Sequence, residues 1–230
     1  ESDEAKACQA NGISYEAIQV ANDALTVVAN PNNPVTCLTV DQLKSVWEPK
    51  STIKNWSEIQ GLEPPFEAEL ALYGPGTDSG TFDFFTDAIN GEEGASRTDY
   101  NDIGEDDNAT VTGVAGADGG MGYFGYSFFK ENEDKVKALE VDNGNGCVPP
   151  SPETAQDGSY SPLSRPLFVY PSATALENET VDAFLQFYLD NINAVAEQVG
   201  FIPLTDEQLS ASQENLDKVT GGGGSGTTTG

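Results

Sequence analysis

The chain has 230 residues, and its 38 acidic against 10 basic side chains give a formal net charge of −28 at pH 7. A field of this sign repels nucleic acid and anionic lipid head groups, so no nucleic-acid partner is expected. The sequence contains no His, which excludes His-based catalytic triads and His-ligated metal sites. Because the acids are dispersed through aromatic-containing segments, they favour adaptation to concentrated salt over an acidic interaction tail.

Hydrophobic periodicity and turn residues predict strands that alternate with helices, and hence an α/β layered fold with a largely parallel sheet. Thr39 and Gln42 form a capping-box pattern at the start of one helix. Apart from a short helix near the amino end, strands are expected at 24–31, 68–74, from 122 onward, 136–142 and 167–172. Helices are expected after Thr39, at 80–89, near 107 and at 181–199. The last ten residues, 221–230, read as a flexible Gly/Ser/Thr tail.

The stretch LYGPGTDSGTFDFF, residues 72–85, places a glycine-rich loop between a predicted strand and a predicted helix. The first N–H groups of a helix lack internal acceptors and lie at the positive end of its dipole. Ser79 and Thr81 add hydroxyl groups there, and Gly80 lets a ligand approach the backbone. The loop therefore predicts an anion site that needs no net positive charge. An ordinary capped strand-to-helix turn is the alternative.

The chain contains two arginines, Arg97 and Arg165. Arg97 follows Thr81 by one helix and a loop, so it can return to the same rim and grip an oxyanion with its planar fork. A salt bridge to one of the many acids is the alternative. Arg165 precedes Pro166 at the start of a predicted strand and is interpreted as structural.

An enzymatic reading is disfavoured by the same residues. A hydrolase with Asp78 or Ser79 as its nucleophile needs a base beside that group, and no spacing supplies one in a chain without His. The loop also lacks the Lys of a nucleotide-binding P-loop. We therefore expect no enzyme, no catalytic residue, no cofactor and no metal site.

Several blocks of the sequence resemble those of a known protein family. The blocks YGPGTDSGTFDFFTDAINGEEGASRTDY, GGMGYFGYSFF, VDNGNGCVPPSPET and PLSRPLFVYPS resemble the substrate-binding protein of the phosphate ABC importer, as do CLTVDQLKSVWEP and NWSEI. The resemblance implies a type II periplasmic-binding-protein-like fold, with two lobes of mixed, largely parallel sheet flanked by helices. It also implies that the protein binds inorganic phosphate, without catalysis, and delivers it to a membrane permease.

The resemblance implies that Ser79, Gly80 and Thr81 form the phosphate-binding loop of the family. Some family members place an arginine four residues before that serine, where this chain has Pro75, and Arg97 is the candidate replacement. Asp78 is expected either to accept the proton of hydrogen phosphate or to cap the helix.

The family normally opens with a strand and two further phosphate-binding loops, and neither loop is found here. The chain therefore resembles a family member without roughly its first third. One lobe, 32–164, is expected to be whole, while 1–31 and 165–220 form an incomplete first lobe. The expected location is extracellular or at the cell surface, with a lipid anchor supplied by a missing amino-terminal part, and the expected state is a monomer.

Within the expected whole lobe, Cys37 opens a helix and Cys147 lies in the connection that leaves the same lobe. We expect these two to form a disulfide, with Cys8 free or paired outside this sequence. The N-glycosylation sequons at Asn55, Asn108 and Asn178 are compatible with an extracellular location.

Two alternative functions remain open. One is a fragment of a phosphate receptor that binds nothing by itself. The other is an acidic extracellular cation-binding surface protein built around DYNDIGEDDN. The acids of that segment lack the rhythm and the Gly of an EF-hand: they are Asp99, Asp102, Asp106 and Asp107.

Overall fold

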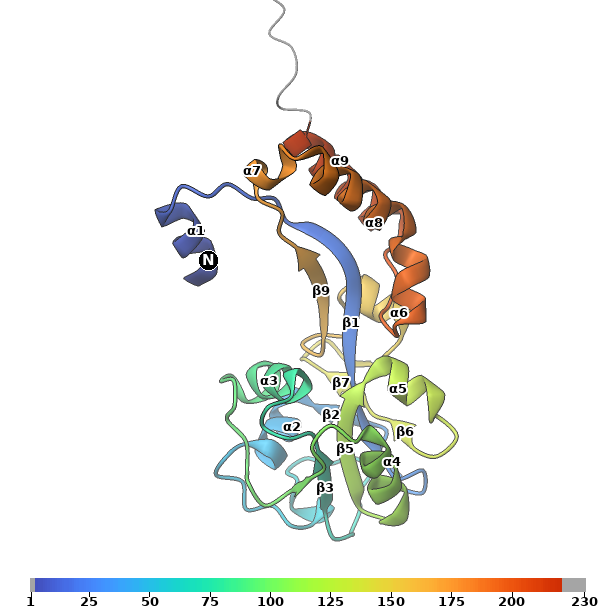
Figure 1. Cartoon of the computed structure of the whole chain (residues 1–230). Helices are drawn as coiled ribbons and strands as arrows, with labels where there is room; N and C mark the ends of the chain where they lie inside the picture. Colours follow the sequence, from blue (N-terminus) through green and yellow to red (C-terminus); the bar gives the residue numbers. More distant parts are fainter. Residues whose placement is uncertain (1–2, 221–230) are drawn as a thin grey trace, which may run out of the picture. The chain divides into compact units, whose positions relative to one another are not determined.

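The computed structural model describes residues 3–220, which divide into two compact units. Unit 2 is Asp23–Arg165, and unit 1 joins the residues up to Asn22 with those from Pro166 onward. The sequence placed the first boundary between 31 and 32. The boundary lies earlier because the long strand β1 (Ile18–Ala29) passes from one unit into the other without a break (Figure 1).

Unit 2 is the larger unit and holds most of the described elements. After β1 these are β2 (Cys37–Thr39), α2 (Val40–Trp47), the 3-10 turn η1 (Trp56–Glu58), β3 (Ala71–Gly74), α3 (Gly80–Phe85), the π-helical turn η2 (Thr86–Asn90), β4 (Asn101–Asp102), α4 (Asp107–Gly116), β5 (Gly120–Gly125), α5 (Tyr126–Glu131), β6 (Lys137–Ala138), β7 (Glu140–Asp142), β8 (Cys147–Val148) and α6 (Pro152–Gln156).

The main sheet has the strand order β4-β3-β5-β1-β6. Strand β3 runs parallel to both β4 and β5, whereas β1 runs antiparallel to β5 and β6. The predicted α/β class with a mixed sheet is therefore confirmed. Parallel pairing matters for the site, because it brings the carboxyl ends of β3 and β4 to one edge of the sheet.

Strand β5 shows how helices cover both faces of this sheet. Successive side chains of a strand point to opposite faces. Phe124 packs with Val111 and Val114 of α4, while Tyr123 stacks on Phe85 of α3, with ring centroids 3.8 Å apart. Figure 1 shows α4 and α5 on one side of β5, with α2 and α3 on the other.

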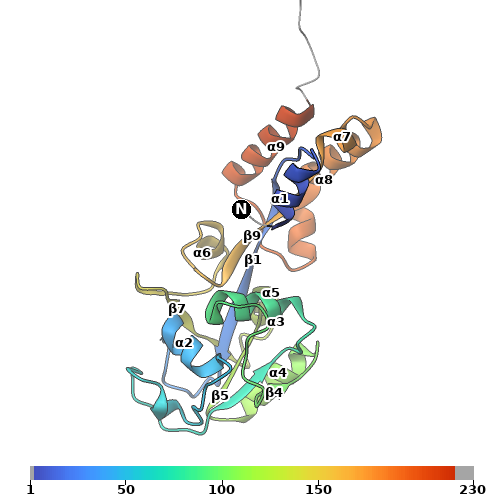
Figure 2. The same cartoon turned by 90° about the vertical axis from the view of Figure 1, so that its left-hand side faces the viewer.

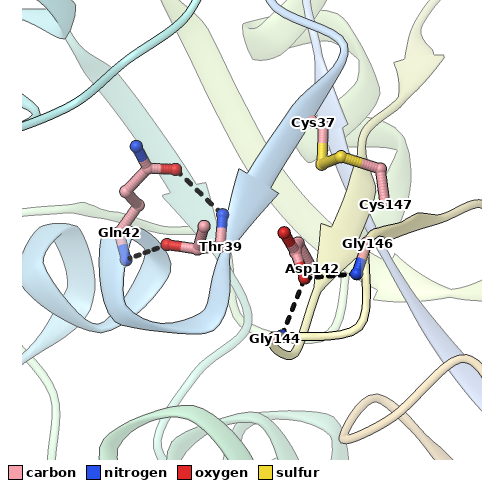
Figure 3. Close-up of a disulfide and its surroundings, with 7 residues drawn as sticks. All are labelled: Cys37, Thr39, Gln42, Asp142, Gly144, Gly146 and Cys147. Atoms are coloured by element: carbon pink, nitrogen blue, oxygen red, sulfur yellow. Dashed lines mark hydrogen bonds between the residues drawn. A yellow bond between two sulfur atoms is a disulfide. The ribbon is translucent and has the colours of Figure 1, made fainter.

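A smaller sheet, in the order β2-β7-β8, is closed by the disulfide between Cys37 and Cys147, whose Cα atoms are 6.0 Å apart. This is the pairing that the sequence predicts. Figure 3 shows the capping box at the start of α2 beside it, where Thr39 and Gln42 satisfy each other's backbone N–H groups. The sequence pattern that predicted this helix start is confirmed.

Unit 1 contains α1 (Asp3–Ala10), the first part of β1, most of β9 (Ser164–Val169), α7 (Ala173–Leu176), α8 (Glu179–Gln198) and α9 (Asp206–Thr220). Strand β9 pairs with β1. The core of this unit packs α8 and α9 against the two strands; its fully buried members include Ile18, Leu189, Ile192 and Leu216. In Figures 1 and 2, α8 lies on one side of the β1/β9 pair and α1 on the other.

The long helix predicted at 181–199 is confirmed as α8, whose buried residues recur at helical spacing. The aromatic strand expected from residue 122 onward ends at Gly125, and the aromatic residues that follow form α5. Helix α9 was not predicted. Among the described helices, none combines the length and the apolarity that crossing a membrane requires.

Candidate functional site

The glycine-rich loop joins the end of β3 to the start of α3, as the sequence predicts. The backbone of the two residues after β4 holds the loop: the N–H of Gly76 donates to the carbonyl of Gly104 over 3.0 Å, and the N–H of Ile103 donates to the carbonyl of Gly74 over 3.1 Å. The hydroxyl of Tyr100 donates to the carbonyl of Pro75 over 2.8 Å. The loop therefore has a fixed path at the edge where β3 and β4 end together.

Gly76 is closely surrounded in this loop. A Cβ there would lie 3.0 Å from Oδ1 of Asp78, 3.3 Å from Cα of Gly104 and 3.4 Å from Oδ1 of Asp102. Two carboxylates thus flank one point of the loop. Oδ1 of Asp102 also accepts the N–H of Gly104 over 2.9 Å, so that carboxylate helps to shape the neighbouring turn.

Ser79 is buried and caps α3, with its Oγ 3.3 Å from the N–H of Thr81. The space around Gly80 is open, because a Cβ there would meet no atom within 4 Å. A ligand can therefore reach the first turn of α3 at Gly80. The loop brings together Asp78, Ser79, Gly80 and Thr81, the residues that sequence reasoning selected.

Arg97 forms a salt bridge to an acid, which is the alternative that the sequence left open. Its side chain is buried, with 4% of the residue exposed. Nε and Nη2 donate to Asp99 over 2.6 and 3.0 Å, and Nη1 donates to the carbonyls of Val46 and Ile53, each over 3.0 Å. A further contact joins Nη1 to Ser51. The guanidinium thus joins the end of α2 and the segment after it to the loop before β4.

This cluster also affects Asp99. Its hydrogen bond with Arg97, followed by the one with Lys54, holds the pKa of its carboxyl far below the ordinary value. The pair Arg97–Asp99 therefore stays charged over the whole neutral and mildly acidic range. A cation committed in this way is not available to a second anion unless it gives up a present partner.

Arg165, interpreted from the sequence as structural, is the more exposed of the two arginines, with 43% of its side chain accessible. Its guanidinium carbon lies 4.1 Å from the ring centroid of Phe84, and its Nη2 lies 3.3 Å from Oδ2 of Asp23. Phe84 follows Gly80 by four residues and Thr81 by three, so the three residues share one face of α3. The half-exposed guanidinium therefore lies about one helical turn from the open start of that helix.

Sequence reasoning missed the contributions of Tyr100 and Asp102 to this loop. Tyr100 immediately precedes β4, and Asp102 ends it, beside the end of its parallel neighbour β3. The carboxyl end of a parallel strand is a usual place for site residues, which is a signal for Asp102. Burial and the charge of Asp102 raise the pKa of the Tyr100 hydroxyl. The hydroxyl that donates to Pro75 is therefore protonated at physiological pH.

The acids of the segment 99–108 do not form a cation site in the described part of the chain. Asp99 pairs with Arg97 and Lys54, and Asp106 caps α4 by accepting the N–H of Asn108 over 3.1 Å. Burial, followed by the charges of Glu105 and Asp106, raises the pKa of Asp107 to about 6.

One group of potential metal ligands is found among residues 3–220, namely Cys37, Glu140 and Cys147. Its two sulfurs are joined in the disulfide, so they are not thiolate ligands. The cation-binding alternative therefore gains no support from the structure.

Comparison with known proteins places these features in a family. The model of the PBP superfamily domain matches residues 1–191. Protein SphX of Synechocystis is 43% identical over 219 residues, which are 94% of this chain and 64% of that protein. The phosphate-binding protein PstS of Staphylococcus saprophyticus is 34% identical, over 95% of this chain and 67% of that protein. The chain thus spans less than two thirds of the Synechocystis protein and about two thirds of the Staphylococcus protein.

The crystal structure of a protein from Planctomyces limnophilus, described as a possible phosphate binding protein, superposes with a TM-score of 0.85 at 39% identity. The match covers 95% of this chain and 78% of that one. Sequence and fold therefore agree, and the chain belongs to the PBP superfamily, in the family of the substrate-binding proteins of phosphate ABC importers.

Proposed function

We propose that this protein binds inorganic phosphate outside the cell, as a monomer, and delivers it to the membrane permease of an ABC importer without catalysing a reaction. The similarity to PstS of Staphylococcus saprophyticus supports the ligand and the transport role. The observation that carries the proposal is the loop 74–81, whose backbone and hydroxyl donors surround an open approach at Gly80. The extracellular location and a lipid anchor are part of the same proposal.

The phosphate oxygens accept hydrogen bonds from the N–H groups of Gly80 and Thr81, the latter in place of its 3.3 Å contact with Oγ of Ser79, and from the hydroxyls of Ser79 and Thr81. Helix N-termini bind anions because these donors lack internal acceptors and lie at the positive end of the dipole. Asp78 accepts the proton of hydrogen phosphate. Sulfate has no such proton at neutral pH, so its oxygens would face a carboxylate without a bridging hydrogen, and the site would reject it.

A charged clamp completes the proposed site, and there are two candidates for it. Arg97 is the choice of the sequence, but its guanidinium already donates to Asp99 and to the carbonyls of Val46 and Ile53. Arg165 is favoured by its exposure and by its stacking on Phe84 of α3. We expect the affinity for phosphate to depend more strongly on Arg165.

Isothermal titration in high salt with phosphate, sulfate and calcium chloride, each separately, tests the proposal. Phosphate is expected to bind, while sulfate and calcium give no saturable heat. Ser79→Ala removes a neutral donor and is expected to weaken phosphate binding by roughly 2- to 10-fold.

Ser151→Ala is the control, because Ser151, like Ser79, is the serine N-cap of a short helix, here α6, where it accepts the N–H of Thr154. It removes a cap of equal kind at a place with no proposed ligand, and its affinity should equal that of the parent chain. Saturable binding of calcium with none of phosphate would overturn the proposed function. Equal losses of affinity in the two serine variants would remove Ser79 from the site.

A further inference from the structure

A tyrosine hydroxyl is buried beside the start of the loop that we propose as the anion site. Tyr123 of β5 is 1% exposed, and its hydroxyl has no hydrogen-bond partner among residues 3–220. A buried polar group that lacks a partner destabilises a fold, and native structures contain few of them. The hydroxyl of Tyr123 therefore indicates a role that the packing of its ring does not explain.

Gly74, the last residue of β3, shows where this phenol lies. A Cβ at Gly74 would be 3.3 Å from Cε1 and 3.5 Å from Cζ of Tyr123, and 3.4 Å from Cε2 of Tyr100. Both phenol rings thus pack against the residue at which the loop begins. The ring of Tyr123 is also held by stacking on Phe85 and by an edge contact with Trp47, with ring centroids 5.1 Å apart. Because Tyr123 is fixed on several sides, a partner for its hydroxyl has to come to it.

Tyr100 offers the acceptor. Its hydroxyl donates to the carbonyl of Pro75 over 2.8 Å, and a hydroxyl oxygen that donates its hydrogen can still accept one. Asp102 is the other acceptor nearby, but it is exposed and its Oδ1 already accepts the N–H of Gly104. Burial, followed by the acidic groups of Tyr100 and Asp102, raises the pKa of Tyr123. The hydroxyl of Tyr123 is therefore protonated at physiological pH and is a donor in search of an acceptor.

We propose that Tyr123 is a positioning residue for the phosphate loop and acts through Tyr100. Phosphate at the start of α3 shifts the loop, and through the bond to Pro75 it brings Tyr100 to Tyr123. The hydroxyl of Tyr123 then donates to that of Tyr100, which donates to the carbonyl of Pro75.

This relay links loop geometry to affinity. Hydrogen bonds in a chain polarise and strengthen one another, above all in a buried setting, so the relay holds the loop in the geometry that binds phosphate. A bond that forms only in the bound state raises the affinity for the ligand and adds nothing to the stability of the free chain. The inference rests on the proposed function, because its ligand is the same phosphate at the same loop.

Tyr123→Phe tests the relay, because it deletes the hydroxyl and keeps the ring. Without phosphate, the midpoint of urea unfolding is expected to rise, since an unsatisfied buried group is removed. In isothermal titration, the same variant is expected to bind phosphate about 3- to 10-fold more weakly, the loss of one neutral hydrogen bond. A merely structural role would move stability and affinity in the same direction.

Tyr100→Phe completes a double-mutant cycle on phosphate affinity. This variant loses the bond to Pro75 as well as the relay, so it should bind phosphate more weakly than Tyr123→Phe. The double variant is expected to bind like Tyr100→Phe alone, within about 2-fold, because Tyr123 acts only through Tyr100. Losses that multiply in the double variant would overturn the relay, since they would show two independent contributions.

Tyr73→Phe is the matched control. Tyr73 directly precedes Gly74 on β3, but it packs against the core that contains Val111 and Val114 of α4, on the face of the sheet opposite α3. The same deletion of a hydroxyl should leave the affinity for phosphate within about 2-fold of the parent chain. Unchanged affinity in Tyr123→Phe, or equal losses in Tyr123→Phe and Tyr73→Phe, would overturn the positioning role while the parent chain still binds phosphate. A parent chain that binds no phosphate would refute the proposed function, and the relay with it.

Discussion

The two arginines differ in how many protein acceptors surround each guanidinium. Arg97 is buried and makes hydrogen bonds to side chains and carbonyls, while Arg165 is half-exposed and rests on an aromatic ring. Removing one partner of a buried ion pair leaves the other uncompensated, and such losses cost about 3–5 kcal/mol. A half-exposed cation has more freedom to turn toward a ligand.

We therefore expect Arg97→Ala to lower the free energy of unfolding by roughly 2–4 kcal/mol, below the fully buried limit because Asp99 is partly exposed. Arg165→Ala is expected to weaken phosphate binding by about 10- to 150-fold, the range for loss of a charge-assisted bond. Urea unfolding and phosphate titration of both variants separate the two effects. A larger loss of affinity in a still-folded Arg97→Ala would instead support Arg97 as the clamp.

Asp99 adds a pH dependence at the same position. Its folded pKa is lowered, chiefly by the hydrogen bond to Arg97. Its contribution to stability is therefore present above the unfolded pKa, about 3.9, and is lost as the pH falls further. Asp99→Asn should destabilise the protein at pH 7 and do so progressively less as the pH falls below about 3.9, as urea unfolding at pH 7 and pH 2 would show. An equal effect at both would rule out the ionic contribution.

At the scale of elements, helix α4 begins with acids that repel one another. Burial and the neighbouring Glu105 and Asp106 raise the pKa of Asp107 to about 6. A raised folded pKa contributes stability below the unfolded pKa, near 3.9, and this contribution is lost as the pH rises to about 6.

Asp107→Asn is thus expected to stabilise the protein at pH 7 by about 1 kcal/mol, a value discounted for partial exposure and for the favourable place of an acid in a first helical turn. No gain is expected at pH 4. Thermal melts at the two pH values measure the difference, and a loss of stability at pH 7 would contradict this account.

The disulfide is an element-scale constraint, because it joins β2 to β8 across 110 residues of sequence. Cross-links that close long loops restrict the unfolded chain, and their removal typically costs 2–5 kcal/mol. We expect Cys37→Ser with Cys147→Ser to lower the free energy of unfolding by about that amount. Cys8→Ser, which removes the unpaired thiol, is the control and should be neutral. A double variant as stable as the parent would show that the bridge does not stabilise the fold.

At the scale of the whole molecule, the dominant property is the formal net charge of −28. Like charges destabilise a compact state through mutual repulsion, and at 1 M salt the screening length falls to about 3 Å. The melting temperature is therefore expected to rise between low salt and about 1 M KCl. A scanning calorimetry series in KCl tests this, and a melting temperature that falls would contradict adaptation to salt.

The sequence by itself determined the features that depend on neighbours along the chain. The capping box of α2 and the apolar stripe of α8 need only residues within a few positions of one another, and local periodicity and hydrogen bonding reveal them. The loop that we propose as the anion site was selected for the same reason, since Ser79, Gly80 and Thr81 follow one another at the start of a helix. The family was readable from blocks of this kind.

Only the tertiary structure decided the features that depend on distant partners. Arg97 is surrounded by acceptors from 44 to 51 residues away in sequence, and no local pattern distinguishes such a site from an oxyanion clamp. The aromatic run after Gly125 forms a helix because Phe128 and Phe129 pack against the core of α4 and β1, overriding its strand propensity. The pairing of β9 with β1 is likewise a property of the assembled sheet, because it joins strands that are far apart in the sequence.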